Sequence, residues 1–264
     1  MTQTVQDKQA YESYFARAST QHRLRYEWIV DTFLDDVQGE RICEVGCGDG
    51  GVVQCLREDN DVVGVDISSA GIDQLTNMGI DAHLVDISSE PLPFDDAWFD
   101  TLIIFEVFEH LANPHHAVEE IQRVVRAGGR VLISIPNPRT GHPYIYPELL
   151  RFGAFKRYLR ANGFTLVRTV PYGLCPPLWR LLRPLVFHPR RLAQSTKAVS
   201  TLGGTVRAPW TTRLARAASG PLATRFKPAR YAWLLVYELL NDDPEGARGL
   251  FDQVAAQTSG AYER

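Results

Sequence analysis

Arg41–Gly51 reads RICEVGCGDGG, a short apolar run that ends in a cluster of glycines. Its first half has the composition of a buried strand, and the residues from Asp49 onward predict a helix. Glycines in such a turn let backbone N–H groups approach a ligand closely, while the helix N-terminus adds partial positive charge. Gly46, Gly48 and Gly51 match the G-x-G-x-x-G dinucleotide fingerprint, which is a weak signal when it stands alone.

The same alternation of strand and helix continues downstream of this turn. Strand-like runs rich in Val, Ile and Leu follow at 61–68, 80–88, 101–106 and 130–137. Helical patterns lie between the strands at 49–58, 69–79 and 114–129, and a turn-rich link lies at 91–100. Near-continuous apolar strands that alternate with helices predict a parallel sheet covered by helices on both faces.

The outer parts of the chain complete the expected organisation. Apolar spacing within 10–38 predicts one or two helices before the first strand. Beyond Pro138 we expect a helix at 147–164, a strand at 164–173 and a last strand at 230–240. The predicted parts are an N-terminal helical cap (1–38), a core (39–173), a basic helical insertion or lid (174–230), and the last strand with its tail (231–264).

The net charge of −3 conceals a strong asymmetry along the chain. Residues 149–237 contain 16 Lys and Arg and no acidic residue, which leaves 12 of the 28 basic and all 31 acidic residues elsewhere. Such a split indicates either an anionic partner for the basic part or attraction between the two parts, within one chain or across an oligomer.

The chain is expected to be cytoplasmic. It has no apolar run of the roughly 20 residues that span a bilayer, no apolar stretch typical of a signal peptide, and no Cys-x-x-Cys pair among its four cysteines. Arg180 and Arg183 mark one face of 174–191 and leucines another, which is typical of an amphipathic lid or of a helix that touches anionic lipid at the inner membrane face. A helix packed on the domain by its leucines explains the same pattern.

Carboxylates at the strand ends narrow the class of ligand. Asp66 ends the second strand 20 residues after Gly46, where a carboxylate can accept hydrogen bonds from ribose hydroxyls. Glu44, two residues before the first glycine, would repel a pyrophosphate but would stabilise a cation in a low-dielectric cleft. S-adenosylmethionine carries both an ammonium and a sulfonium. Asp86, after the third strand, is then placed to accept from an adenine amino group.

Five ordered motifs resemble those of class I S-adenosylmethionine-dependent methyltransferases: ICEVGCGDGG, VVGVDIS, LVDISSEPLPFDDAWFD, IIFEVFEHLANP and RVVRAGGRVLISIPN. The resemblance covers 39–138 and is strongest to the subgroup that includes the ubiquinone-biosynthesis O-methyltransferases. It implies a Rossmann-like, doubly wound α/β fold with seven mostly parallel strands, a reversed last strand, and a helical insertion between strands six and seven. It also implies that the cofactor contacts Glu44, Gly46, Cys47, Gly48, Asp66, Ile67, Asp86, Ile87 and Glu106.

The segment IIFEVFEH raises the question of catalysis. A helix starting at Glu106 would place Glu106, Glu109 and His110 on one face. These residues could bind Mg²⁺ or Mn²⁺, as the E-x-x-E-H sites of some relatives do, although Mg²⁺ is the less favoured reading. Alternatively His110 is a general base, or the segment only shapes the cofactor pocket. His142 is the second catalytic candidate, whereas His115 and His116 are expected on a solvent face without function.

The expected reaction is methylation of an oxygen in a small metabolite or in a lipid-linked, anionic molecule. Tyr11, Tyr14 and Phe15 could close the substrate side of the site, as the N-terminal helix does in relatives. The alternatives are an RNA 2′-O-methyltransferase, N- or C-methylation of a small molecule, and a non-catalytic or oxidoreductase protein of the same fold. Nucleic acid is the less favoured partner, because the basic segment lacks a recognisable RNA-binding module and its aromatics are sparse.

Overall fold

The computed structural model describes residues 20–137, 145–146, 149, 152–172 and 234–242. The chain forms two compact units, one of residues 1–135, 144–169 and 237–264 and the other of 136–143 and 170–236. The contacts described below lie within the first unit. The insertion 174–230 and the residues Tyr11, Tyr14, Phe15 and His142 lie outside the described residues, and the predicted part boundaries stay predictions.

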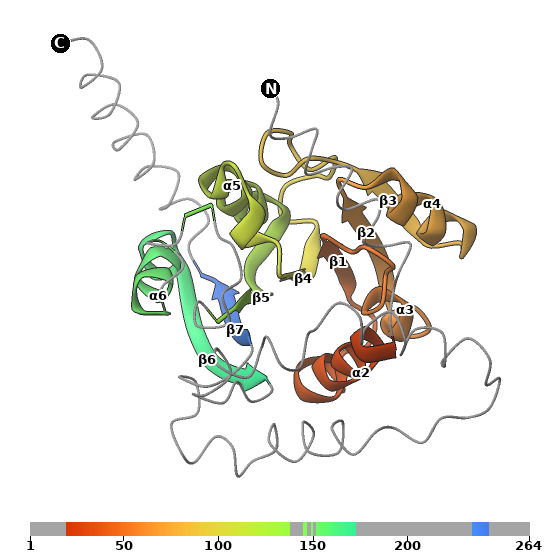
Figure 1. The fold of residues 1–264 in the computed structure, drawn as a ribbon, viewed down its shortest axis with the longest axis horizontal. Helices are drawn as coiled ribbons and strands as arrows, with labels where there is room; N and C mark the ends of the chain where they lie inside the picture. Colours follow the sequence, from red (N-terminus) through yellow and green to blue (C-terminus); the bar gives the residue numbers. More distant parts are fainter. Residues whose placement is uncertain (1–19, 138–144, 147–148, 150–151, 173–233, 243–264) are drawn as a thin grey trace, which may run out of the picture. The chain divides into compact units, whose positions relative to one another are not determined.

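A seven-stranded sheet in the order β3-β2-β1-β4-β5-β7-β6 organises the fold (Figure 1). Parallel pairing joins β1 to both β2 and β4, β2 to β3, and β4 to β5. Burial of the apolar runs on both faces drives this arrangement, since the interiors of β1, β2, β4 and β7 are almost entirely inaccessible to solvent, whereas the edge strands β3 and β6 are more exposed. The strands are β1 (Arg41–Val45), β2 (Asp61–Asp66), β3 (Asp81–Leu84), β4 (Phe99–Phe105), β5 (Val125–Pro136), β6 (Phe164–Tyr172) and β7 (Leu234–Asn241).

Helices cover both faces of this sheet. The connections β1→β2 and β2→β3 step toward one edge, while β4→β5 steps toward the other. Because parallel crossovers are right-handed, helices in the first two connections cover one face and helices after β4 cover the opposite face, and Figure 1 shows α3 and α5 on different sides. These helices are α3 (Val53–Leu56), α4 (Ser69–Asn77), α5 (Pro114–Val124) and α6 (Phe152–Ala161).

The last strand runs against its neighbours, which confirms the predicted reversal. Asn241, the final residue of β7, donates hydrogen bonds from its side-chain amide to the carbonyl oxygens of Gln122 (3.0 Å) and Val125 (2.7 Å). Val125 begins β5, so the end of β7 lies beside the beginning of β5. The fold is therefore the predicted Rossmann-like α/β sheet.

The N-terminal helical prediction holds for its described part. α2 (Thr20–Ile29) continues without interruption as a π-helix, η1 (Val30–Leu34). Trp28, Ile29 and Phe33 are buried, as their helical spacing predicted. No helix in the described ranges is both long enough and apolar enough to cross a membrane.

Two predicted helices are longer than the observed ones. The helix predicted at 49–58 is confined to Val53–Leu56, because turns occupy the residues around it. The helix predicted at 114–129 ends at Val124, and the chain then joins β5. Gly128 adopts φ +70, and a Cβ on Gly129 would lie 2.8 Å from the Arg126 carbonyl oxygen. These glycines form a bulge where the β4–β5 register shifts.

Candidate cofactor and active site

The glycine turn after β1 adopts a conformation that other residues disfavour. Gly46 has φ +71 and Gly48 has φ +53, both in the left-handed region. A Cβ on Gly46 would lie 2.2 Å from Cγ2 of Val107, so glycine is also required by the close approach of the segment after β4. The turn is anchored to β2, because the Gly46 N–H donates to the Val65 carbonyl at 2.7 Å. The predicted ligand loop is therefore preformed.

Asp66 connects this turn to the end of β2. Its carboxylate is buried and accepts hydrogen bonds from the N–H groups of Gly48 and Ser68, each at 2.8 Å. A carboxylate has about four lone-pair sites, so Asp66 can hold the turn and still accept from a ribose hydroxyl. Ile67 follows it half-exposed. Both residues therefore lie at the carboxyl end of β2, and their contact with a cofactor stays a prediction.

Glu44 is a buried carboxyl at the end of β1. It is 4% exposed, and its Oε2 accepts a hydrogen bond from the Val53 N–H at the start of α3 (3.1 Å). Burial raises the pKa of Glu44 to about 8, because the charged form loses its hydration. A cation bound beside it would recover that loss. The site therefore fits a ligand with a positive group, such as an ammonium, next to the glycine turn.

Asp86 and Ile87 follow β3 and lie at the same edge of the sheet. The Asp86 carboxylate accepts from the Ser88 N–H (2.9 Å) and the Ser89 hydroxyl (3.1 Å), an arrangement that closes the turn on itself. Ile87 is buried. Because β1, β2 and β3 are neighbours and parallel, their carboxyl ends bring Glu44, Asp66 and Asp86 to one edge, where ligands bind in open α/β sheets.

Cys47 contributes differently from its neighbours. Its side chain is buried, and Sγ would lie 3.0 Å from a Cβ added to Gly64 on β2. Burial raises the pKa of the Cys47 thiol well above its ordinary value. Its N–H donates to the Val65 carbonyl at 3.1 Å. Cys47 therefore packs the turn onto the sheet rather than presenting a side chain to a ligand.

Glu106 immediately follows β4 and pairs with a residue that the sequence did not single out. Its carboxylate forms an ion pair with Arg25 of α2. Glu106 has φ +55, and its N–H donates to Oγ of Ser134 at 3.1 Å. Arg25 is 81 positions away in sequence, so no local pattern could have indicated this contact. The pair brings a guanidinium and a carboxylate to the edge that holds Glu44.

A second α2 residue contacts the glycine turn directly. The Tyr26 hydroxyl donates to Asp49 at 3.2 Å, and the Tyr26 ring lies 2.0 Å from where a Cβ on Gly51 would be. The third glycine of the fingerprint, Gly51, therefore makes room for the Tyr26 ring. Helix α2 therefore forms part of the site.

The helix predicted from Glu106 is wrong. Only Phe108–His110 form a 3₁₀ turn, and the positive φ of Glu106 excludes it from any helix. Glu109 is fully buried and burial raises its pKa well above the ordinary value, while the side chain of His110 is 34% exposed. His110 Nε2 lies 3.8 Å from Oε1 of Glu109. The three residues therefore do not share one face.

The described part of the chain holds no group of side chains arranged to bind a metal ion. Within those ranges, no three His, Cys, Asp or Glu side chains come together as metal ligands do. Of the two histidines expected on a solvent face, His115 is exposed and lies 2.9 Å from the Tyr158 hydroxyl. His116 is half-buried, and its Nδ1 lies 3.0 Å from the Ile87 carbonyl oxygen, which corrects the prediction for this residue.

This sheet order, reversed last strand and preformed glycine turn define the fold of class I S-adenosylmethionine-dependent methyltransferases. Residues 43–133 match the family model described as "Methyltransferase domain". N-methyltransferase NodS from Bradyrhizobium japonicum, solved with S-adenosyl-L-homocysteine, superposes with a TM-score of 0.54 at 13% identity over 89% of this chain and 97% of that chain. The [4+2]-cyclase SpnF superposes with a TM-score of 0.53 at 20% identity, over 85% of this chain and 83% of that chain. These two likenesses show the fold alone.

Curated relatives refine the assignment. The ubiquinone biosynthesis O-methyltransferase of Alkalilimnicola ehrlichii is 30% identical over 132 residues, which are 48% of this chain and 53% of the relative. The ubiquinone biosynthesis O-methyltransferase of Paracidovorax citrulli is 32% identical over 133 residues, which are 48% of this chain and 55% of the relative. The chain thus spans about half the length of these relatives. Residues 43–133 therefore form a methyltransferase domain with the class I S-adenosylmethionine-dependent fold, and this part of the chain is similar to the ubiquinone-biosynthesis O-methyltransferases.

Proposed function

We propose that the domain transfers the methyl group of S-adenosylmethionine to an oxygen atom of a small metabolite or of a lipid-linked, anionic molecule. The observation that carries the cofactor is Glu44, a buried carboxyl with raised pKa beside a preformed glycine turn. Oxygen as the acceptor is supported by relatives named for O-methylation, including a 27-O-demethylrifamycin SV methyltransferase of Amycolatopsis mediterranei, 28% identical over 112 residues.

Different side chains at the site would bind different groups of the cofactor. Glu44 would hold the ammonium group and Arg25 the carboxylate of the methionine moiety, because each pairing joins opposite charges at a water-poor edge. Asp66 would hold the ribose, and Asp86 with Ile87 would frame the adenine. The bound cofactor supplies a methyl group that its sulfonium already activates, so alignment of the acceptor contributes much of the rate.

His110 is the residue proposed for proton transfer. It lies in the turn after β4, at the same sheet edge, and its side chain is one-third exposed. A hydroxyl acceptor loses its proton during transfer, and an imidazole accepts a proton near neutral pH. The segment beside it is held in place, because the Ile145 N–H donates to the Glu109 carbonyl (3.1 Å) and the Tyr146 hydroxyl to the Ala112 carbonyl (2.9 Å).

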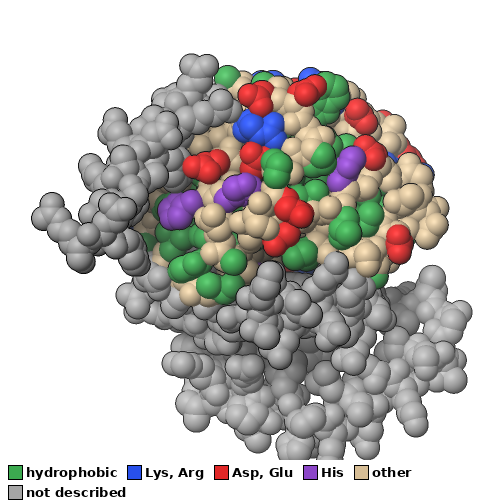
Figure 2. Space-filling view, turned by 90° about the horizontal axis from the view of Figure 1, so that it is seen from above, with side chains coloured by type: hydrophobic (Ala, Val, Ile, Leu, Met, Phe, Trp, Pro, Cys, Tyr) green, Lys and Arg blue, Asp and Glu red, His purple; other side chains and the backbone are tan. Residues whose placement is uncertain are grey.

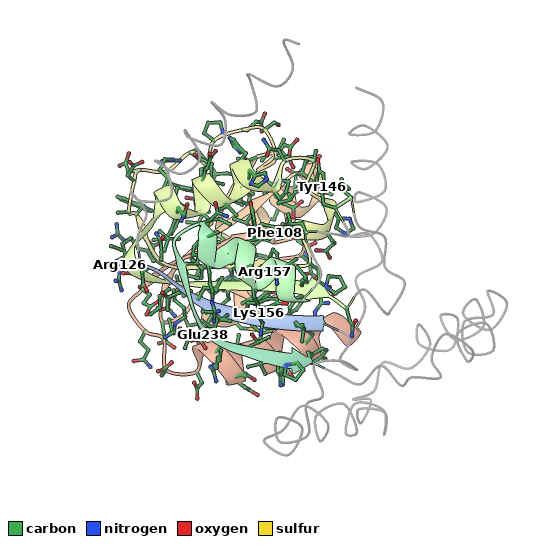
Figure 3. The ribbon with its side chains drawn as sticks, turned by 90° about the vertical axis from the view of Figure 1, so that its left-hand side faces the viewer. Phe108, Arg126, Tyr146, Lys156, Arg157 and Glu238 are labelled. Carbon is green, nitrogen blue, oxygen red and sulfur yellow. The ribbon has the colours of Figure 1, made fainter. Side chains whose placement is uncertain are left out.

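Basic residues favour an anionic acceptor or surface. Lys156, Arg157 and Arg160 lie on α6, the first two labelled in Figure 3, and none of the three pairs with a carboxylate within the described ranges. Repulsion adds to burial in lowering the pKa of Lys156, with Arg160 as its neighbour one turn away. Contact of the basic 149–237 stretch with an anionic substrate, or with an anionic membrane surface, is part of this proposal.

Calorimetry with S-adenosylhomocysteine, with NAD⁺ as a comparison, tests the cofactor. We expect the protein to bind the first and not the second, and Glu44→Gln to weaken binding by at least tenfold. Transfer from labelled S-adenosylmethionine to matched phenol, aniline and carboxylate acceptors then tests the acceptor atom. His110→Asn should lower kcat and leave the affinity for S-adenosylhomocysteine unchanged. Absence of S-adenosylhomocysteine binding, or transfer to nitrogen only, would overturn the proposal.

A further inference from the structure

Side chains on one face of α5 hold several main-chain groups of the link between β3 and β4 (residues 85–98). His116, Glu120 and Arg123 lie at positions i, i+4 and i+7 of this helix and therefore share a face. Together these three side chains, termed the α5 clamp, contact main-chain groups from Ile87 to Phe94. This link carries Asp86 and Ile87, the predicted adenine contacts.

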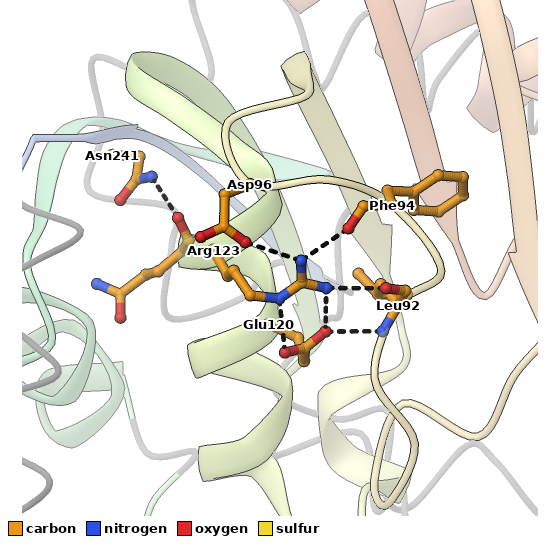
Figure 4. Close-up of polar contacts among 7 residues, drawn as sticks. Leu92, Phe94, Asp96, Glu120, Arg123 and Asn241 are labelled. Carbon is orange, nitrogen blue, oxygen red and sulfur yellow. Dashed lines mark hydrogen bonds and ion pairs between the residues drawn. The ribbon is translucent and has the colours of Figure 1, made fainter.

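Two members of the α5 clamp, Glu120 and Arg123, form an ion pair that also bonds main-chain groups of the link (Figure 4). Arg123 donates to the carbonyls of Phe94 (2.7 Å) and Leu92 (2.8 Å) and pairs with Glu120 and Asp96. Glu120 in turn accepts from the Leu92 N–H at 2.7 Å. Burial alone would raise the pKa of Glu120, but these hydrogen bonds hold it below its ordinary value. The second half of the link is therefore fixed.

His116, the third member of the α5 clamp, contacts the link next to the proposed cofactor site. Its Nδ1 lies 3.0 Å from the carbonyl oxygen of Ile87. A carbonyl can only accept, so Nδ1 carries the proton in this contact. The backbone of His116 is also fixed, because its N–H donates to the N-cap side chain of Asn113 at 3.2 Å. The imidazole is thus held by the helix start and directed at the residue that follows Asp86.

The same helix start is joined to the segment that contains His110. The Ala112 N–H donates to Oγ of Ser88 at 3.2 Å. Two contacts from adjacent parts of the chain, Ala112 to Ser88 and His116 to Ile87, therefore bracket the turn at 86–90.

We propose that His116 is a positioning residue for the cofactor, which fixes the carbonyl of Ile87 and with it the wall that faces the adenine ring. The inference rests on the proposed function for the identity of the ligand, but the positioning itself can be measured without ligand. Removing the imidazole leaves the turn at 86–90 with only the Ala112–Ser88 contact and its internal hydrogen bonds, so its main chain moves more and the cofactor loses affinity because it must order the turn on binding. Methyl transfer from the bound cofactor is unaffected.

Three variants separate this role from a general loss of helix stability. His116→Leu removes the donor, and His116→Asn places an amide N–H near the position of Nδ1. His115→Leu is the matched control, because His115 contacts Tyr158 on α6 and not the link. We compare the hydrogen exchange of the Ser88, Ser89 and Glu90 amides without ligand, the Kd for S-adenosylhomocysteine, and kcat.

The expected pattern is faster exchange at 88–90 and about tenfold weaker binding in His116→Leu, the size of one lost hydrogen bond. His116→Asn should restore most of both, His115→Leu should resemble wild type, and kcat should be unchanged throughout. Wild-type exchange in His116→Leu, or equal effects of His116→Leu and His115→Leu, would overturn the inference. If wild-type protein binds no S-adenosylhomocysteine, the proposed function fails, and the exchange comparison still decides whether His116 positions the turn.

Discussion

Glu44 is a residue that is unfavourable for the fold but suited to the proposed ligand. Its carboxyl is taken out of water at the end of β1, where it caps the start of α3 through the Val53 N–H. An uncharged side chain of the same shape would cap the helix without the cost of burying a charge. A carboxyl at this position therefore suits the proposed contact with a cationic group of the cofactor better than it suits the fold.

This burial predicts a pH-dependent stability. The pKa of Glu44 is about 8 in the folded protein against 4.5 as the ordinary value, so between these pH values the folded state binds more protons than the unfolded state. Its contribution to the free energy of unfolding therefore falls as pH rises through that window. We expect Glu44→Gln to unfold like wild type near pH 4.5 and at a higher temperature than wild type at pH 8, measured by thermal denaturation. An equal difference between the two proteins at both pH values would contradict this.

The E-x-x-E-H residues allow a direct test of metal dependence. Glu106 is engaged by Arg25, and Glu109 lies in the core with its side chain away from solvent. We therefore expect methyl transfer to be the same in EDTA and in added Mg²⁺, measured as initial rates with labelled cofactor. Loss of activity in EDTA that Mg²⁺ restores would contradict it and would return Glu106, Glu109 and His110 to the role of ligands.

At the scale of elements, α2 is coupled to the glycine turn through Tyr26. Gly51→Ala would place a methyl group against the Tyr26 ring and disturb its hydrogen bond with Asp49. We expect a loss of about 1–3 kcal/mol in the free energy of unfolding, as for other overpacked sites, measured by urea denaturation.

Gly153→Ala is the matched control for this change. Gly153 is exposed on α6, and a Cβ there would meet only the end of the Arg157 side chain, at 3.4 Å. Alanine is favoured over glycine within a helix by roughly 1 kcal/mol, so this variant should be at least as stable as wild type. Similar losses in both variants would show that Tyr26 does not limit the space at Gly51.

Much of the fold followed from the sequence, because apolar runs and glycine turns are local signals. They predicted the strands at 61–66 and 164–172 and the helix at 69–77 almost to the residue. The end of α5 was missed, since the apolar and charged residues of 121–129 fit a helix equally well and only pairing with β4 extends them. The contacts of Arg25 with Glu106 and of His116 with Ile87 were missed because the partners are distant in sequence.

At the scale of the whole molecule, acidic and basic residues are distributed unequally. Figure 2 shows acidic side chains scattered over one face of the described part, with few basic ones among them. On the edge of the sheet formed by β6, Arg168 pairs with Glu238 of β7, and Arg130 of β5 lies 3.9 Å from the same carboxylate. Glu238 thus joins three strands.

Asn241 predicts how strongly the sheet depends on its last strand. Its side chain is fully buried and is the donor to two carbonyls, those of Gln122 and Val125. Asn241→Ala leaves both acceptors without this donor, so we expect a loss of about 2–6 kcal/mol, from 1–3 kcal/mol for each of the two unsatisfied groups. Urea denaturation measures this, with Asn77→Ala on the exposed end of α4 as the control. An unchanged midpoint for Asn241→Ala would contradict the argument.

The insertion of β7 between β5 and β6 also sets an order of assembly. The strands whose ends carry the proposed cofactor contacts, β1 to β4, and their neighbour β5 are complete by residue 136, whereas β7 ends about a hundred residues later. During synthesis the cofactor half emerges first and can pair its strands, while the edge of β5 waits for a strand not yet made. Until β7 is made, the unpaired edge of β5 is a surface that chaperones can protect or that strands of other chains can join. Asn241 closes it as one of the last contacts of the sheet to form.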